Sequence, residues 1–293
     1  MERFIGYLIN GLSTGSIYAL VALGYTMVYG IIKLINFAHG DFIMVGCFTV
    51  FYLLIKLNAS PFIAIAAAVL VCVILGVTTE KIAYKPLRKS KRITALITAI
   101  GVSIIIENVF LNWYSKNELT NSEKYFNIGY IQWGNVLISG VSLLILGILV
   151  VSTIILTLFI SYTNTGKAMR AVSENTAAAE LMGINVDRTI SITFAIGCTL
   201  AGIASIMYYL NYPQIGATLG STLGIKAFVA AVLGGIGLIP GAVLGGLIIG
   251  IIEGFAIGFG FSQWVDVILF LILILVLILK PTGILGKSKK EKV

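Results

Sequence analysis

The sequence predicts an all-α polytopic membrane protein, a helical bundle of about eight or nine transmembrane segments, and two observations carry this prediction. First, 58% of the 293 residues are hydrophobic and 11% are charged, whereas a soluble domain carries about 25% charged residues. Second, the apolar residues form continuous runs, and a spanning helix needs about 20 of them. A transmembrane β-barrel is excluded because its strands would alternate apolar and polar residues.

Nine apolar runs are candidate spans, and together they make residues 1–293 a single transmembrane domain. The runs are Phe4–Ile32, Phe37–Ile55, Pro61–Thr79, Ile93–Trp113, Val136–Ile160, Ile190–Leu210, Leu223–Leu233, Gly241–Gly258 and Trp264–Leu279. The first run is long enough to tilt or break. The seventh is too short to span comfortably, so we expect a re-entrant or broken helix there.

The basic residues predict the orientation of these spans. One basic cluster lies within Lys81–Arg92 and another lies in the tail, residues 280–293. Cytoplasmic loops carry such clusters, so the N-terminus and the loop Tyr114–Asn135 are expected outside. The polar segment Ser161–Arg188 and the tail are expected in the cytoplasm. Topology and attraction to anionic membrane lipid explain the net charge of +8, so nucleic-acid binding is not expected.

Four glycines near the end of the chain give the clearest packing signal. Gly246, Gly250, Gly254 and Gly258 recur at every fourth position, and Gly11 and Gly15 form a shorter pair of the same kind. Residues four apart share one helix face, and a glycine face lets another backbone approach closely. The pattern predicts helix packing within one subunit, with a subunit interface or a pore wall as alternatives.

Two carboxylates lie deep within predicted spans, Glu107 and Glu253. Such groups face a bundle interior or a wet cavity, so each is a proton relay, a contact for a substrate amine, or a partner in a structural hydrogen bond. The polar stretch from Asn36 to Asp41 holds His39, the only histidine, and is interpreted as a helix–helix turn with Asp41 in the first turn of the next helix. No spacing indicates a metal site.

The longest polar interruption is Ser161–Arg188. Asn175 or Thr176 can cap a short helix over residues 177–182, Gly183 can end it in a left-handed conformation, and Asn185 can cap the next span. Leu181 and Met182 would then be free to enter a groove on a partner. An ordinary amphipathic loop is the alternative.

A nucleotide site is not expected in this chain, and neither is an enzymatic activity. Gly286-Lys287-Ser288 imitates the end of a phosphate-binding loop, but Pro281 stands where that motif needs its first glycine. If ATP is used, another polypeptide must bind it. No cofactor is expected in the chain itself.

Three stretches resemble the LivH-type permeases of bacterial branched-chain amino acid importers. They are GLSTGSIYALVALGYTMVYGIIKLINFAHGDFIMVG, TGKAMRAVSENTAAAELMGINVDR and AAVLGGIGLIPGAVLGGLIIGIIEG, in that order along the chain. The resemblance implies the fold of an ABC importer permease in the bacterial inner membrane. It also implies partners: a homologous second permease, two cytoplasmic ATPases that bind ATP, and an extracytoplasmic substrate-binding protein.

The resemblance assigns contact with the ATPases to a coupling segment at residues 161–189. The positions that match the family's coupling motif are Asn175, Ala178, Ala179, Gly183 and Ile184. Candidates for the translocation path are Ser13, Thr14, Ser16, Asn36, His39 and Glu107. Alternative functions are a urea or amide permease of the same family, a secondary amino acid transporter coupled to protons through Glu107 and Glu253, and a passive channel.

Overall fold

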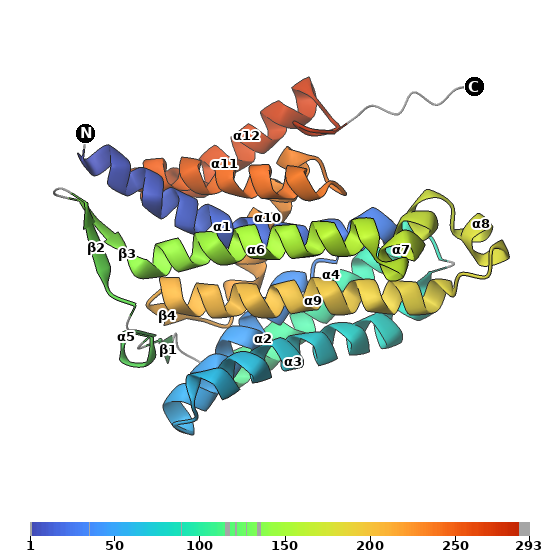
Figure 1. Cartoon of the computed structure of the whole chain (residues 1–293), viewed down its shortest axis with the longest axis horizontal. Coiled ribbons are helices and arrows are strands. Elements are labelled where there is room, and N and C mark those ends of the chain that lie inside the picture. The colour runs from blue at the N-terminus through green and yellow to red at the C-terminus, as the bar shows by residue number, and fades with distance from the viewer. Residues whose placement is uncertain are drawn as a thin grey trace.

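The protein is a bundle of long helices, seen here in a computed structural model (Figure 1). The structure describes residues 2–34, 36–88, 90–114, 118–120, 122–126, 128–133 and 136–286. The tail predicted for residues 280–293 therefore lies outside the described residues from position 287 onward, as do Lys287 and Ser288. In the predicted outer loop Tyr114–Asn135, residues 115–117, 121, 127 and 134–135 are likewise not described.

The first half of the chain forms four long helices. They are α1 (Glu2–Ile32), α2 (His39–Phe51, continued by a π-helical turn, Tyr52–Lys56), α3 (Pro61–Thr79, continued by a π turn, Glu80–Tyr84, and a 3-10 turn, Lys85–Leu87) and α4 (Arg92–Trp113). Pro61 begins α3 at a position where the missing N–H has no intrahelical acceptor. The long first span is one continuous helix, so the predicted option of a broken helix is wrong.

The second half adds a hairpin and further helices. The elements are β1 (Glu118–Leu119), α5 (Ser122–Tyr125), β2 (Tyr130–Trp133), β3 (Val136–Ser139), α6 (Gly140–Tyr162), α7 (Asn164–Glu174), α8 (Thr176–Leu181), α9 (Val186–Asn211), β4 (Gln214–Ile215), α10 (Leu219–Gly234), α11 (Ile239–Gly258), a 3-10 turn (Ser262–Trp264) and α12 (Val265–Leu279). Strand β2 pairs antiparallel with β3, and β1 pairs antiparallel with β4. The predicted span from Val136 is wrong at its start, because residues 136–139 belong to the hairpin.

Eight described helices are long and apolar enough to cross a membrane, and α10, with 16 residues, is a shorter apolar helix. This agrees with eight or nine predicted segments and with the short seventh run. Burial separates the helices: the most apolar window of α1 is 78% buried, whereas those of α4 and α12 are 11% buried. Helix α1 is thus the centre of the bundle, and α4 and α12 lie at its edge.

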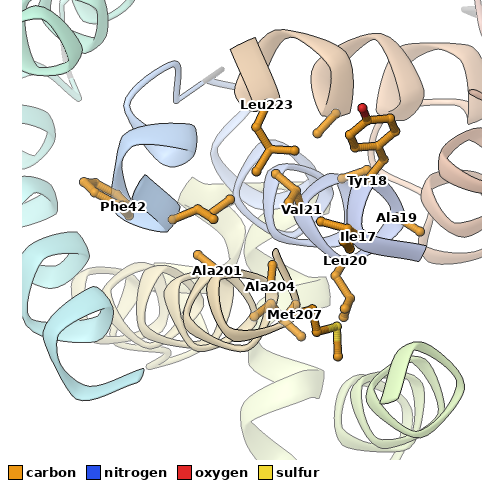
Figure 2. Close-up of a cluster of buried hydrophobic side chains, with 14 of the residues drawn as sticks. Ile17, Tyr18, Ala19, Leu20, Val21, Phe42, Ala201, Ala204, Met207 and Leu223 are labelled. Carbon is orange, nitrogen blue, oxygen red and sulfur yellow. The ribbon is translucent and has the colours of Figure 1, made fainter. Parts of the chain in front are cut away.

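The core gathers around the middle of α1. Figure 2 shows Ile17, Leu20 and Val21 of α1 surrounded by side chains from three other helices. These include Phe42 of α2, Ala201, Ala204 and Met207 of α9, and Leu223 of α10. Burial of these side chains is a large part of the packing that holds four helices together.

The glycine ladder of α11 packs against α1. A Cβ added to Gly250 would overlap the backbone of Gly15, and one added to Gly11 would lie 2.8 Å from the Cα of Ile251. Gly246 meets Ala19 in the same way, Gly254 meets Gly11, and Gly258 lies on the ring of Tyr7. We call this contact the α1–α11 seam. It lies within one subunit, as the packing interpretation expects.

Helices α2 and α10 both begin inside the bundle rather than at its ends. The His39 ring lies against Gly24, eight residues before the end of α1 and therefore about 12 Å from it along the helix. Gly40 of α2 in turn packs on Gly220 and Gly224 of α10. Backbone that leaves a helix at this depth is tolerated where surrounding protein buries it. The two N-termini therefore meet in the interior.

Candidate functional site

The two ends of the bundle differ, and the polar segment 161–189 lies at one of them (Figure 1). Helices α7 and α8 protrude at one end, which we call the α8 end, whereas the β2–β3 hairpin lies at the other, the hairpin end. The 3-10 turn after α3 contacts the start of α9 at the α8 end through ion pairs, so this basic cluster lies beside α8. The predicted topology likewise places both on one side.

Helix α7 connects α8 to the core. The Thr163 hydroxyl caps α7 by accepting a hydrogen bond from the Gly166 N–H at 3.0 Å. Met169 and Val172 are buried, while Arg170 donates a hydrogen bond to the Ile160 carbonyl of α6. Helix α7 packs against α1, α6 and α9. The sequence analysis did not predict this helix, although its cap and its buried side chains at a three-residue spacing are local signals.

Helix α8 has a defined start and end. The Asn175 side chain accepts a hydrogen bond from the Ala178 N–H at 3.0 Å, and Gly183 has φ = +81°, which favours glycine. The Asn185 side chain then caps α9 through the Arg188 N–H at 2.9 Å. The predicted caps are confirmed, with Asn175 rather than Thr176 as the N-cap and the helix ending at Leu181.

The exposed residues at the end of α8 include two large apolar side chains beside the charged Glu180. Leu181 is 89% exposed and Met182 is 82% exposed, whereas Ala179 is buried and Ile184 is half-buried. The Ile184 N–H donates to the Ala179 carbonyl at 3.0 Å, which closes the turn after α8. Two large apolar side chains at a bundle end are therefore free for a partner, and the backbone that carries them is ordered by its own caps.

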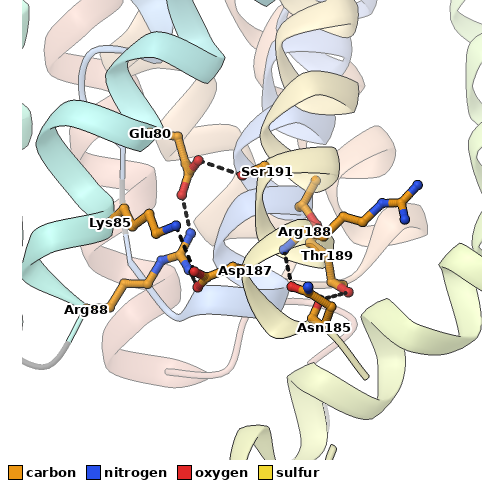
Figure 3. Close-up of polar contacts among 9 residues, drawn as sticks. Glu80, Lys85, Arg88, Asn185, Asp187, Arg188, Thr189 and Ser191 are labelled. Carbon is orange, nitrogen blue, oxygen red and sulfur yellow. Dashed lines mark hydrogen bonds and ion pairs between the residues drawn. The ribbon is translucent and has the colours of Figure 1, made fainter. Parts of the chain in front are cut away.

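An ion-pair cluster anchors α9 immediately after this segment (Figure 3). Arg88 binds both Glu80, whose side chain is fully buried, and Asp187. Lys85 pairs with Asp187 at 2.8 Å. Ser191 of α9 donates to the second oxygen of Glu80 at 2.8 Å. The cluster joins the end of α3 to the first turns of α9, and sequence reasoning had treated its bases only as signals of topology.

The six predicted path residues do not come together. Ser13 donates to the Asn211 side chain at 3.2 Å, and Thr14 accepts from the Tyr212 hydroxyl at 3.2 Å, both at the hairpin end. Ser16 donates a hydrogen bond to the Leu12 carbonyl of its own helix at 2.7 Å. The remaining three lie elsewhere: Asn36 accepts from the Tyr84 hydroxyl at 2.6 Å, Glu107 accepts from the Ser221 hydroxyl at 2.9 Å, and His39 is buried beside Tyr25.

Lys226 is the charged residue that the sequence analysis missed. Its ammonium lies 2.9 Å from Glu253 and 3.4 Å from Asp266, while the Tyr18 hydroxyl donates to Glu253 at 2.7 Å. A lone lysine within the apolar run Leu223–Leu233 was the available signal. Among the described residues, no group of three or more His, Cys, Asp or Glu could hold a metal ion.

The architecture defines a class of protein: a multi-pass helical membrane protein with a short, capped helix exposed between two of its spans. Comparison with known proteins then gives the family. The family model described as the permease component of the branched-chain amino acid transport system matches residues 7–277. The chain belongs to this family, as the resemblance implied.

Similar proteins cover nearly the whole chain. The high-affinity branched-chain amino acid transport system permease protein BraD of Pseudomonas aeruginosa is 43% identical over 302 residues, covering 99% of this chain and 98% of that protein. The corresponding LivH protein of Escherichia coli K12 is 41% identical over 303 residues, with the same coverage of 99% and 98%. The solved structure of PsaBC from Streptococcus pneumoniae in complex with Fab has a TM-score of 0.49 and 18% identity, covering 95% of this chain and 96% of that one.

Proposed function

We propose that this chain is the transmembrane permease subunit of an ABC importer that moves branched-chain amino acids into the cytoplasm. Family membership supports the substrate class, since the relatives named above are branched-chain amino acid permeases and the similarity covers nearly their full length. The importer would reside in the bacterial inner membrane, with the N-terminus outside and the α8 end in the cytoplasm, where positively charged loops belong.

The observation that carries the mechanism is the exposed face of α8. ATPase subunits that bind ATP would receive Leu181 and Met182 in a groove, the mode by which short amphipathic helices dock. Asn175, Ala178, Ala179, Gly183 and Ile184 would hold the shape of that helix rather than supply most of the contact area.

Motion of α8 has a direct route into the bundle. Helix α7 packs on α1, α6 and α9, and the Arg88 cluster fixes the first turns of α9 to the end of α3. A displacement of α8 by the ATPases would therefore pass through α7 to α6 and α9, and from α9 through the Arg88 cluster to the end of α3. In this proposal a second, homologous permease completes the path, and a binding protein delivers the amino acid to the hairpin end.

The proton-coupled alternative drew on Glu107 and Glu253. Both carboxylates have partners in the structure: Ser221 for Glu107, and Lys226 with Tyr18 for Glu253. The family relationship does not favour this alternative, nor the urea or amide permease.

Co-purification tests the proposal. The tagged chain is expressed with its candidate ATPases and second permease, and Leu181→Asp and Met182→Asp are compared with Leu137→Asp, which alters an apolar side chain 68% exposed at the hairpin end. We expect the α8 variants to lose ATPase binding and leucine uptake together, because a charge is costly in an apolar groove, while Leu137→Asp retains the ATPases. Full ATPase binding by both α8 variants would contradict the docking mode. Uptake that continues without ATPases and stops when the proton gradient is collapsed would contradict the importer class.

A further inference from the structure

A second polar region lies toward the hairpin end, away from α8. A cleft of about 330 Å³ opens between the end of α9 and the start of α10, with Tyr208, Tyr212, Thr218 and Thr222 in its lining. Tyr212 and Pro213 also line a larger cavity of about 830 Å³ beneath the hairpin. The cleft, which we call the outer cleft, therefore adjoins the larger cavity at the hairpin end.

Opposite charges lie one helical turn along α10 from the last residue that lines the outer cleft. Lys226 is four residues beyond Thr222 and shares its face of α10. Its ammonium is bonded to Glu253 at 2.9 Å, and the Tyr18 hydroxyl donates to the other oxygen of the same carboxylate at 2.7 Å. The Lys226 side chain is 22% exposed and that of Glu253 is 10% exposed. Ionised groups among spanning helices are costly to insert and generally mark a substrate or ion pathway.

Aromatic surface adjoins these charges. The rings of Tyr208 and Tyr212 stack with centroids 4.3 Å apart, and both rings line the cleft. Burial raises the pKa of Tyr212 to about 12, so its phenol stays neutral at physiological pH and donates to Thr14. The region thus combines an ammonium, a carboxylate and apolar ring faces in one place.

The start of α10 is tightly packed beside the outer cleft. Leu219 lines the cleft, and the next residue, Gly220, packs directly against Gly40 of α2 and the Asp41 carboxylate. The meeting of the two helix N-termini leaves no room for an added side chain at Gly220.

We infer that the outer cleft binds a free α-amino acid, with Lys226 receiving its carboxylate, Glu253 receiving its ammonium, and Tyr208 and Tyr212 contacting an apolar side chain. The inference rests on the proposed function and adds a binding site within the permease. In the substrate-free chain Lys226 is paired with Glu253 at 2.9 Å and with the more exposed Asp266 at 3.4 Å. A zwitterion can replace that ion pair with two new pairs, so that no buried charge is left without a partner.

Protection of an introduced cysteine tests this site. Thr222→Cys places a thiol in the outer cleft, while the native residues Cys47, Cys72 and Cys198 are buried and should not react. Membranes containing the full importer are treated with a membrane-impermeant maleimide in the presence of L-leucine, L-leucinamide or 4-methylpentanoate. We expect leucine to slow labelling about tenfold at a concentration ten times its dissociation constant. Each analogue lacks one charge and should protect far less.

A matched control and two kinds of variant make the result specific. Phe261→Cys, at an exposed position of the same end, should label at the same rate with or without leucine. In the Thr222→Cys background, Lys226→Met and Glu253→Gln should each abolish protection. If either variant fails to fold, the exchange Lys226→Glu with Glu253→Lys is made together with Asp266→Asn, which removes the carboxylate 3.4 Å from the Lys226 ammonium. This variant keeps an ion pair, and it should fold but remain unprotected by leucine.

Three outcomes would overturn the inference: no protection by leucine, equal protection by all three compounds, or full protection in the charge-exchanged variant, which would make the pair structural only. Failure of the proposed function looks different. Leucine would then protect Thr222→Cys although ATPases neither bind nor drive uptake. If leucine is taken up with ATP while labelling ignores leucine, the importer proposal stands and the outer cleft is not its binding site.

Discussion

The α1–α11 seam and the segment from α7 to α9 are ordered by opposite means. In the seam, two helices touch through backbone because Gly11, Gly15 and Gly250 have no side chains. In the segment, Asn175 and Gly183 define a helix through bonds and dihedral angles within a few residues, and Leu181 is left exposed. The seam depends on distant partners and tolerates no added atom. The segment depends on local signals and leaves its surface available.

This difference predicts where substitutions act. A change in the seam must alter the packing of the whole bundle, because α1 is at its centre. A change on α8 should alter binding of a partner with little effect on the bundle.

Gly250→Leu should be the most damaging change. Its Cβ would overlap Gly15, so α1 and α11 must separate, and overpacking of this kind costs about 3 kcal/mol in the free energy of unfolding. The thermal midpoint of the purified chain in detergent measures the loss. The control is Gly101→Leu in α4, where an added Cβ meets nothing within 4 Å. We expect the control to change stability by less than about 0.5 kcal/mol. Equal effects of the two variants would contradict the seam.

The Arg88 cluster joins α9, the last element of the segment, to the end of α3, and its loss should give an intermediate response. Glu80→Gln leaves the guanidinium of Arg88, 16% exposed, without its buried anion, and such a loss costs about 3 kcal/mol or somewhat less where water has access. Asp187→Asn removes a carboxylate that is 54% exposed, so its cost should stay below about 1 kcal/mol. Thermal midpoints at low and at high salt measure both.

The contributions of the two carboxylates to stability should also depend differently on ionic strength. The stabilisation by Asp187 should weaken as ionic strength rises, because solvent-exposed charges are screened. That by Glu80 should persist, since its side chain is fully buried. A larger loss of stability in Asp187→Asn than in Glu80→Gln would contradict this account. Asp187 of α9, rather than Glu80 at the end of α3, would then be the residue that holds the cluster together.

The sequence predicts features that depend on neighbouring residues better than features that depend on contacts between distant helices. Asn175, Gly183 and Asn185 were predicted as caps because each acts within a few residues of its own position. The glycine ladder predicted close packing, but it could not name α1 as the partner. The pair of Lys226 and Glu253 joins residues 27 positions apart on separate helices, and no local pattern places them together.

The interior start of α2 and α10 was beyond sequence reasoning for a related reason. The run Leu223–Leu233 was recognisably short, but its depth depends on Gly40 packing against Gly220 and Gly224. The path candidates failed to converge because polarity alone does not say which way a helix faces. Ser16, for example, uses its hydroxyl on the Leu12 carbonyl of its own helix. Helix α7, by contrast, had local signals that could have been recognised.

The smallest effect on stability is expected at the caps, and it should differ between two asparagines with the same hydrogen bond. Asn175→Ala removes the bond to the Ala178 N–H, a local loss of about 1 kcal/mol, and Asn185→Ala removes the equivalent bond to the Arg188 N–H. Helix α8 has six residues and little packing, whereas α9 has 26 and a long buried face. Short helices are marginal without tertiary support.

Amide hydrogen exchange at residues 176–181 and 186–191 measures the difference. Asn175→Ala should speed exchange in α8 about fivefold, the factor that corresponds to about 1 kcal/mol, and Asn175→Asp, which keeps the acceptor, should restore the slow rate. Asn185→Ala should change exchange in α9 much less, because packing and the Arg88 cluster hold its first turns. Equal acceleration in both helices would mean that the first turns of α9 depend on their cap as strongly as α8 does, and the separation between a packed bundle and a locally ordered helix would fail at this point.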